Sequence, residues 1–305
     1  MKLKLLIIGS HGFLGSNISS HFESLGHVVF SCDFLDIRNE KNYFRINPFK
    51  SDYLEIFEIQ QFDLVINCAG SANVGASMED PFFDFDLNVN VVSKILGAIY
   101  KTNKDTKFIN ISSAAVYGNP IDLPIKTEYA DNAIPISPYG VHKRMAELLL
   151  KSYFDTFNIP TCSLRVFSAY GNGQKKLLMW DLFQKFQDDA FDTIELFGTG
   201  NETRDFIHIN DILQQIELVI KYAPFNGESI NIANGEAIKI SEIAAIFQNH
   251  LNSNKSIKFN NIVREGDPLH WCADIETLKS WSYTQSLSLN DGIKQYIDWN
   301  CEEEN

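Results

Sequence analysis

Short apolar runs alternate with longer segments of helical periodicity through the first half of this chain, and this alternation restricts its fold more than any other feature. The apolar runs are nearly continuous, which is typical of strands that are covered on both faces of a sheet. Strand, helix and strand in that order predict βαβ units, and therefore a doubly wound, parallel α/β sheet. The predicted strands are LKLLIIG, HVVFSCD, FDLVINCAG, TKFINISS and PTCSLRVFS. The helical segments between them include GFLGSNISSHFESLG and PFFDFDLNVNVVSKILGAIYKT.

Beyond about residue 170 the alternation becomes less regular, and the runs LLMWDLFQKFQ, TIELFG, RDFIHINDI and SINIAN follow one another. We therefore predict a first domain over residues 1–170, to which segments near 206–235 return. Residues 171–305 are expected to form mainly a smaller C-terminal α/β lobe. The sequence contains neither internal repeats nor a low-complexity linker.

The composition argues against several classes of partner and site. The chain has 26 Lys and Arg against 39 Asp and Glu, for a formal net charge of −13, whereas nucleic acids and anionic membranes require clustered basic residues. Five cysteines without a CxxC motif favour reduced thiols and a cytoplasmic location. Seven histidines without an HExxH motif predict no metal site. The apolar run from Leu5 to Ile8 is too short for a signal peptide, and no run approaches the ~18 residues that span a bilayer.

A glycine-rich segment, GSHGFLG, joins the first predicted strand to the first predicted helix and contains Gly9, Gly12 and Gly15. Glycines there let the backbone approach a pyrophosphate at the helix N-terminus, where free N–H groups and the helix dipole favour negative charge. The next predicted strand ends at Asp33, where a carboxylate can accept ribose hydroxyls and repel a 2′-phosphate. These features predict a dinucleotide site that prefers NAD to NADP, although Arg38 nearby leaves NADP open.

The segment SPYGVHK places Tyr139 and Lys143 four residues apart at the start of a helical pattern. A lysine ammonium about 6 Å from a tyrosine, at an effective dielectric of ~20, favours the phenolate by roughly 2.8 kcal/mol, or about two pKa units. Tyr139 would then be able to take a proton from a substrate hydroxyl. Tyr100 and Lys104 have the same spacing, but no glycine loop or serine strand surrounds them, so we assign them to the surface.

Two further loops follow predicted strands, at the edge where parallel sheets bind ligands. NCAG, residues 67–70, has small side chains that leave room for a cofactor. ISSAAVYG offers the hydroxyls of Ser112 and Ser113, one of which would hold a substrate oxygen near Tyr139. Either loop by itself is equally typical of a simple turn.

Taken in order, the glycine loop with Asp33, NCAG, SSAAVYG and YGVHK resemble the extended short-chain dehydrogenase/reductase superfamily, and within it the NAD-dependent nucleotide-sugar epimerase/dehydratase family. The resemblance covers nearly the whole chain and extends to LNVN, LRVFSAYG, GTGNETRDFIHINDI and REGDPLHWCADI. It implies a Rossmann-type first domain with NAD as cofactor and a C-terminal lobe that binds a nucleotide-diphosphate sugar.

The resemblance also implies roles for individual residues. Ser113, rather than Ser112, is implied as the catalytic serine because it immediately precedes the Ala-x-Val-Tyr-Gly run, and it acts with Tyr139 and Lys143. The implied cofactor-binding residues are Gly9, Gly12, Phe13, Leu14, Gly15, Asp33, Cys68, Ala69, Gly70, Asn88, Tyr139 and Lys143. The implied substrate-binding residues are Ser113, Ser168, Arg204, Arg264, Asp267 and Trp271, with the arginines near phosphate and Asp267 near the nucleoside ribose.

Several positions depart from the family pattern. Ala114 and Ala115 stand where 4,6-dehydratases carry an acidic pair, which argues against dehydration, and related decarboxylases also tend to carry an acid there. Ser168 replaces an Asn that often contacts the substrate in 4-epimerases, and Asn47 replaces an Asp that commonly meets the adenine. Trp271 aligns with a position that faces the sugar C2, where an indole would exclude an N-acetyl group; a Trp in the core of the lobe is the alternative.

These features predict an isomerase, a 4-epimerase that oxidises C4 of an NDP-hexose to a transient 4-keto sugar and regenerates its cofactor in each turnover. An oxidoreductase, either an NDP-4-keto-6-deoxyhexose reductase or an NDP-sugar 4-dehydrogenase, would use the same residues. A non-catalytic dinucleotide sensor is the alternative from another class. The resemblance further implies a homodimer built on a four-helix bundle from residues near 82–101 and 138–157, and a place in polysaccharide biosynthesis.

Overall fold

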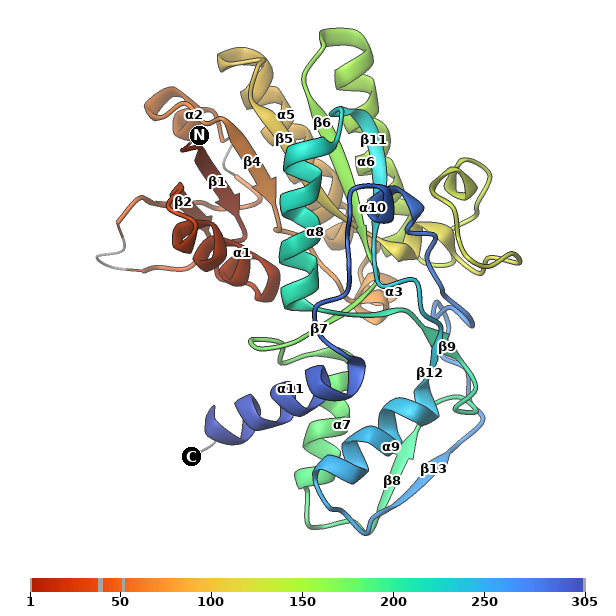
Figure 1. Ribbon diagram of the computed structural model, residues 1–305. Coiled ribbons are helices and arrows are strands. Elements are labelled where there is room, and N and C mark those ends of the chain that lie inside the picture. The colour runs from red at the N-terminus through yellow and green to blue at the C-terminus, as the bar shows by residue number, and fades with distance from the viewer. Residues whose placement is uncertain (1, 38–40, 51–52, 304–305) are drawn as a thin grey trace. The chain divides into compact units, whose positions relative to one another are not determined.

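The computed structural model describes residues 2–37, 41–50 and 53–303, and the chain divides into two compact units (Figure 1). Unit 1 comprises Met1–Gly118, Thr127–Val166 and Val219–Asn231. Unit 2 comprises Asn119–Lys126, Phe167–Leu218 and Ile232–Asn305. Arg38, which kept NADP open as a cofactor, lies outside the described residues.

Unit 1 contains a seven-stranded sheet in the order β11-β6-β5-β4-β1-β2-β3, and every strand pair with a described register is parallel. All five strands predicted from the sequence are present, which confirms the parallel α/β fold. Strand β3 was not predicted, because its three residues are too few to show a pattern. The strands are β1 Lys4–Ile8, β2 Val28–Asp33, β3 Tyr43–Arg45, β4 Leu64–Asn67, β5 Lys107–Ser113, β6 Thr161–Val166 and β11 Asn226–Ile232.

Helices cover both faces of this sheet. Leu6 and Ile8 of β1 pack in one apolar core with Ile95 of α5 and Leu150 of α6, and all four are fully buried. On the other side α1 contacts β1 and β2, as Figure 1 also shows. The α-helices of unit 1 are α1 Phe13–Ser24, α2 Leu54–Ile59, α3 Val74–Glu79, α4 Pro81–Phe85, α5 Val91–Thr102 and α6 Pro138–Phe157, with 3₁₀ turns at Ala114–Tyr117 and Thr127–Asp131.

The long helix predicted from PFFDFDLNVNVVSKILGAIYKT is not regular. Asp80 caps α4 by accepting a hydrogen bond from Phe83 N–H, and a π-helical segment, Asp86–Asn90, then separates α4 from α5. Such π segments occur mostly inside α-helices and frequently at functional sites. Here the segment contains Asn88, whose amide bonds back to Asp84, four residues earlier.

Unit 2 is built from short elements around a second apolar core that includes Phe183, Phe247 and Tyr296. Its strands pair as β10 with β7, β9 with β12, and β8 with β13. The strands are β7 Ser168–Tyr170, β8 Thr193–Leu196, β9 Thr203–Arg204, β10 Phe206–His208, β12 Ile238–Lys239 and β13 Ser256–Phe259. The helices are α7 Leu177–Gln187, α8 Ile209–Tyr222, α9 Ile240–His250, α10 Glu276–Ser280 and α11 Leu289–Glu303, and α8 continues into unit 1. In the described part of the chain no helix is long and apolar enough to cross a membrane.

A buried ion pair ties α6 to β5 and β6 in unit 1. Arg165 of β6 donates through Nε and Nη2 to both oxygens of Glu147 of α6, at 2.9 and 2.8 Å, and each residue is 3% exposed or less. Ser112 of β5 donates to Glu147 Oε1 at 2.6 Å, and Arg165 Nη1 donates to the Tyr117 hydroxyl at 2.9 Å. This network fixes α6 against the strand that carries the candidate catalytic serine, Ser113.

We expect Arg165→Met to lower the free energy of unfolding by about 3–5 kcal/mol, because it leaves the Glu147 carboxylate buried without its main partner. Adding Glu147→Leu should recover part of the loss, since a buried ion pair replaced by apolar residues is often close to neutral. Urea unfolding measures both effects. Lys294→Ala, which breaks the exposed pair with Asp298, is the control and should leave the free energy of unfolding nearly unchanged. An equally small cost for Arg165→Met would contradict the prediction.

Candidate active site

The glycine loop packs its backbone closely against the turn after β4. Gly9 has φ +76°, and a Cβ on it would lie 2.6 Å from the backbone nitrogen of Ala69. A Cβ on Gly15 would overlap the carbonyl oxygen of Gly9. Gly12 caps α1 in an extended conformation, without a side-chain hydrogen bond, and Phe13 and Leu14 follow as partly exposed residues of the first turn. The predicted loop therefore brings bare backbone to the start of α1, where an anion is favoured.

Asp33 ends β2, as predicted, and its carboxylate is held in place beside this loop. Its Oδ2 accepts from His11 N–H at 2.9 Å and its Oδ1 accepts from Phe34 N–H at 2.7 Å. Each oxygen keeps a further lone pair for a ligand hydroxyl, and the negative charge disfavours a phosphate. Asn47, which stands where relatives carry an Asp, accepts backbone hydrogen bonds from Phe49 and Lys50 and so stabilises its own turn.

The NCAG turn after β4 borders a second crowded space. Gly70 has φ +142°, and a Cβ on it would lie 2.6 Å from Asn88 Oδ1 and 3.4 Å from Lys143 Nζ. Asn88 is 1% exposed, and its Oδ1 has no hydrogen-bond partner among the described residues. Burial raises the pKa of the neighbouring Cys68 thiol to about 12, against the lowering effect of Lys143. A buried acceptor without a partner beside glycines that exclude any side chain fits a bound ligand at this position, and a dinucleotide supplies suitable hydroxyl and amide donors.

Tyr139, Ser113 and Lys143 lie together in unit 1, as the sequence predicted. Tyr139 is in the first turn of α6, which Ser137 caps by accepting from Gly140 N–H at 3.2 Å. The Tyr139 side chain hydrogen-bonds Ser113, which ends β5. Lys143 Nζ lies 5.8 Å from the centre of the Tyr139 ring and donates to the Ile111 carbonyl at 3.0 Å.

Gly140 and the buried alanines after Ser113 allow this approach. A Cβ on Gly140 would lie 2.5 Å from the carbonyl oxygen of Ala115, so only glycine lets α6 start this close to the 3₁₀ turn. Ala114 and Ala115 are 0% and 7% exposed and bring no acid to the site. The adjacent Ser112 is engaged with Glu147 instead, so the contact to Tyr139 belongs to Ser113.

The sequence argument for a lowered tyrosine pKa is wrong for the protein without ligands. Burial raises the pKa of Tyr139 to about 12, although the hydrogen bond from Ser113 acts in the opposite direction. Burial likewise lowers the pKa of Lys143 to about 8, against the raising effects of Asp84, Cys68 and Glu147. The expected separation of about 6 Å between the two side chains was correct. The sequence argument omitted the cost of removing both groups from water, which opposes each charged form.

Of the candidate substrate residues, Ser113 lies in unit 1 and the other five lie in unit 2, namely Ser168, Arg204, Arg264, Asp267 and Trp271. The Arg204 guanidinium lies 5.6 Å from the Trp271 ring centre and feels the charge of Asp267, so these three are close together. Arg264 is exposed and lies 3.9 Å from the Phe197 ring centre. Ser168 begins β7, and its backbone N–H donates to the Asp205 carbonyl. Phe197 was not singled out from the sequence, although it directly precedes the GTGNETRDF run that pointed to Arg204.

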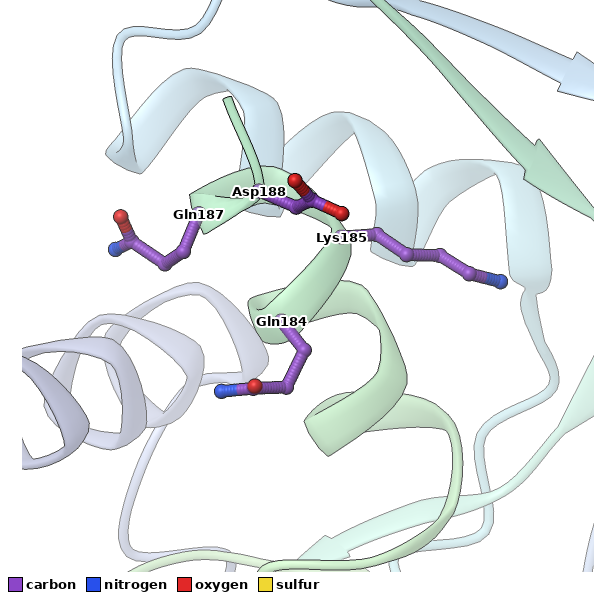
Figure 2. Close-up of a pocket in the computed structure, with 4 residues that line it drawn as sticks. All are labelled: Gln184, Lys185, Gln187 and Asp188. Carbon is purple, nitrogen blue, oxygen red and sulfur yellow. The ribbon is translucent and has the colours of Figure 1, made fainter. Parts of the chain in front are cut away.

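A surface pocket at the end of α7 contains none of these residues. Figure 2 shows the side chains of Gln184, Lys185, Gln187 and Asp188 that line it. The volume of the pocket is about 340 Å³. Lys185 is paired with Asp181 at 2.7 Å, and the polar ends around the pocket carry no arrangement suited to proton or phosphate chemistry. We assign it no function.

We expect Lys143→Met to be more stable than the parent protein at pH 7, because it removes a buried charge. The folded pKa of about 8 lies below the ordinary 10.5, so between these pH values the unfolded state binds more protons and the parent gains stability as the pH rises. The advantage of the variant should therefore shrink by about 3 kcal/mol from pH 7 to pH 10.5. Urea unfolding at both pH values tests this, with the exposed Lys104→Met as control. A constant difference would contradict it.

Comparison with known proteins identifies the family. The sequence pattern of the NAD dependent epimerase/dehydratase family matches residues 5–233. A putative UDP-glucose 4-epimerase of Methanocaldococcus jannaschii is 28% identical over 97% of both chains. A UDP-glucuronic acid 4-epimerase of Bacillus cereus, solved with UDP-glucuronic acid and NAD, has a TM-score of 0.86 at 26% identity and covers 98% of this chain and 99% of its own. A UDP-N-acetylglucosamine 4-epimerase of Methanobrevibacter ruminantium has a TM-score of 0.86 at 25% identity, over 99% and 100% of the two chains. This chain is therefore a member of the NAD dependent epimerase/dehydratase family.

Proposed function

We propose that this protein is an NAD-dependent 4-epimerase that acts on a UDP-hexose through a transient 4-keto sugar. The observation that carries the proposal is the meeting of Tyr139, Ser113 and Lys143 beside the glycine turns of unit 1. The similar proteins described above support it, since they include a putative UDP-glucose 4-epimerase, a UDP-glucuronic acid 4-epimerase and a UDP-N-acetylglucosamine 4-epimerase. Ala114 and Ala115 leave no acid at these positions for dehydration, which favours the return of hydride to the oxidised sugar over the loss of water.

NAD is the cofactor that the residues of unit 1 fit. Gly9, Gly12 and Gly15 would hold its pyrophosphate at the start of α1, with Phe13 and Leu14 in the first turn. Asp33 would accept the adenosine ribose hydroxyls, which favours NAD over NADP. Cys68, Ala69, Gly70 and Asn88 would line the nicotinamide end, together with Tyr139 and Lys143. When bound, NAD would supply the acceptor for the hydride from the sugar C4 and, after the 4-keto sugar has turned, the donor of that hydride to its other face.

The catalytic residues move and hold a single proton. Tyr139 takes the proton from the sugar O4 and later gives it back, which makes it general base and then general acid. Lys143 stabilises the phenolate as long as it is an ammonium, and so its low pKa of about 8 limits the reaction at alkaline pH. Ser113, whose side chain hydrogen-bonds Tyr139, would hold O4 within reach of the Tyr139 hydroxyl. The proton moves only between the sugar O4 and Tyr139, so these steps need no water molecule as acid or base.

Residues of unit 2 are proposed to bind the nucleotide diphosphate. Arg204 and Arg264 would donate charge-assisted hydrogen bonds to phosphate, which an acidic protein must provide locally. Asp267 would accept from the nucleoside ribose, and Ser168 would contact the sugar. In this proposal residues 1–170 form the dinucleotide-binding domain, with segments near 206–235, and residues 171–305 form mainly the nucleotide-sugar lobe.

A homodimer is proposed on the helices α5 and α6. Val141, Met145 and Leu148 recur at helical spacing on α6 and are 40%, 38% and 54% exposed, which gives this helix an apolar stripe outside the core. Tyr100 of α5 is 40% exposed. A four-helix bundle between two copies would cover these side chains. We further propose a cytoplasmic enzyme that supplies sugar donors for polysaccharide synthesis.

We expect Tyr139→Phe to lower kcat on the order of 10²- to 10⁴-fold while leaving bound NAD in place, since the change removes only the proton-transfer group. Chromatographic separation of UDP-glucose from UDP-galactose, and of the two UDP-hexuronic acids, measures the rate. Tyr100→Phe is the matched control, because Tyr100 also has a lysine four residues later but is exposed, and it should leave the rate unchanged.

Denaturing the desalted parent protein and identifying any released nicotinamide distinguishes the reactions. Near-stoichiometric NAD without added cofactor supports the epimerase. Consumption of free NADH or NADPH with a 4-keto sugar would assign the protein to the reductases instead. Retained NAD with no turnover of any nucleotide sugar, in the parent and in Tyr139→Phe alike, would contradict an enzymatic role.

Trp271 supplies a prediction about the sugar. If its indole faces C2, UDP-glucose should be turned over at least tenfold faster than UDP-N-acetylglucosamine, and Trp271→Ala should narrow that ratio. Its 9% exposure and its contact with Phe167, at 5.9 Å between ring centres, equally suit a residue of the unit 2 core. Equal kcat/KM values for the two donors in the parent protein would therefore contradict a contact with the sugar and assign Trp271 to the packing of unit 2.

A further inference from the structure

A buried carboxylate and imidazole in unit 1 have no part in the proposed proton transfer. Asp84 of α4 is 2% exposed and His142 of α6 is 9% exposed. Asp84 Oδ2 lies 2.6 Å from His142 Nδ1, and an ionised Asp84 requires that nitrogen to be the donor. His142 directly precedes Lys143 in α6, so the pair joins two helices next to the catalytic set.

Asp84 also sets the orientation of the Asn88 amide. Asn88 Nδ2 donates to the Asp84 carbonyl at 3.1 Å and to Asp84 Oδ1 at 3.0 Å. Since both acceptors belong to Asp84, the NH₂ group must face this residue and Oδ1 must face away from it. Asn88 Oδ1 and Lys143 Nζ border the same small space, because both would lie within 3.4 Å of a Cβ on Gly70. An acceptor, and not a second donor, is thereby presented near the ammonium.

The two carboxylates near Lys143, those of Asp84 and Glu147, differ in how far they are neutralised. Burial lowers the pKa of Lys143, and Asp84, Cys68 and Glu147 act against this. Glu147 already accepts two hydrogen bonds from Arg165, and a further one from Arg144. Asp84 has no Arg or Lys partner among the described residues, and its carboxylate is shared only with His142 and Asn88. Glu147 is thus compensated by two guanidinium groups, whereas the ionisable partner of Asp84 in the described part of the chain is the His142 imidazole.

We propose that Asp84 and His142 are positioning residues for the catalytic lysine, in which His142 fixes Asp84, and Asp84 orients Asn88 and keeps the buried Lys143 ammonium charged. The proposal rests on the proposed function for its catalytic meaning, since Lys143 matters there as a cation. Asn88 lies in the π-helical segment that follows α4, and from there its amide donates to Asp84.

The charge of Asp84 does not assist Tyr139 directly. Burial raises the pKa of Tyr139, and Asp84 raises it further, while the hydrogen bond from Ser113 lowers it. A carboxylate placed only to activate the tyrosine would therefore have the wrong sign. Its benefit must act through Lys143 and Asn88, which makes the titration of Lys143 the quantity to measure.

The test is an NMR titration of lysine with ¹³C at Cε, in the whole protein without added substrate, with the Lys143 signal assigned by its loss in Lys143→Met. Asp84→Asn keeps the size of the side chain but removes its charge, so one of its two contacts then meets a mismatched group. We expect the pKa of Lys143 to fall by about one unit, and the alkaline limit of kcat to fall by about one pH unit with KM little changed.

His142 provides a second pair of variants in case Asp84→Asn does not fold. His142→Asn keeps a donor near the place of Nδ1 and should retain the Lys143 titration. His142→Leu removes the donor, so that the buried Asp84 carboxylate takes up a proton or turns away, and the Lys143 titration should shift in the direction of Asp84→Asn. Asp205→Asn is the control, because Asp205 is a fully buried carboxylate of unit 2 that accepts from the backbone N–H groups of Asn234, Gly235 and Ala273. It should cost stability and leave Lys143 unchanged.

A Lys143 titration that is the same in the parent, in Asp84→Asn and in His142→Leu would overturn the proposal, even if both variants were less stable, because the pair would then only join two helices. The titration needs no substrate, so its result is independent of the proposed reaction. A shifted titration in a protein with no epimerase activity would preserve the positioning role and reject the proposed function.

Discussion

Burial of the Lys143 ammonium is the constraint on which the rest of unit 1 depends. A lone buried cation is costly, and the fold meets that cost with one carbonyl acceptor, from Ile111, and with carboxylates on two elements. The small residues around it follow from the same need. Gly70 leaves space beside Nζ, and Gly140 lets α6 start close to the turn after β5. A side chain at Gly70 would collide with Asn88 Oδ1, and one at Gly140 would collide with the Ala115 carbonyl oxygen.

The two carboxylates near this lysine, Glu147 and Asp84, differ in their hydrogen-bond partners and therefore in their roles. Glu147 is held by Arg165 on both oxygens and so serves mainly to fix α6 on β6. Asp84 lacks such a partner among the residues that the structure describes, and its charge remains available to the site. The difference follows from the strand beneath each residue: β6 brings a guanidinium to Glu147, whereas Asp84 meets an imidazole and an amide. A buried charge acts on its surroundings only as far as its partners leave it uncompensated.

The parts of this structure that the sequence predicted are those encoded by neighbouring residues. The strands of the parallel sheet, the glycine loop and the spacing of Tyr139 and Lys143 are local patterns, and the structure contains them all. The contacts that complete the site join residues far apart in the chain. Asp84 and His142 are separated by 58 positions, and Ser112 and Glu147 by 35. No periodicity or motif of a single sequence reports such a contact. The π-helical segment was predicted as ordinary helix for another reason, since five residues of wider winding inside a helical pattern do not change its apolar periodicity enough to be seen.

The comparison between the two Tyr–Lys pairs shows why the pKa prediction failed in sign. Lys104 lies 4.1 Å from the ring centre of Tyr100, closer than Lys143 lies to that of Tyr139, at 5.8 Å. Proximity alone would make the surface pair the better catalyst. Tyr100 is 40% exposed, however, so water screens the charge of its lysine. At Tyr139 burial first makes ionisation harder, raising the pKa to about 12, and the same burial makes every charge brought into the site act more strongly. Burial likewise raises the pKa of Tyr117, so the raised pKa of Tyr139 follows mainly from its burial and does not mark it as the catalytic residue.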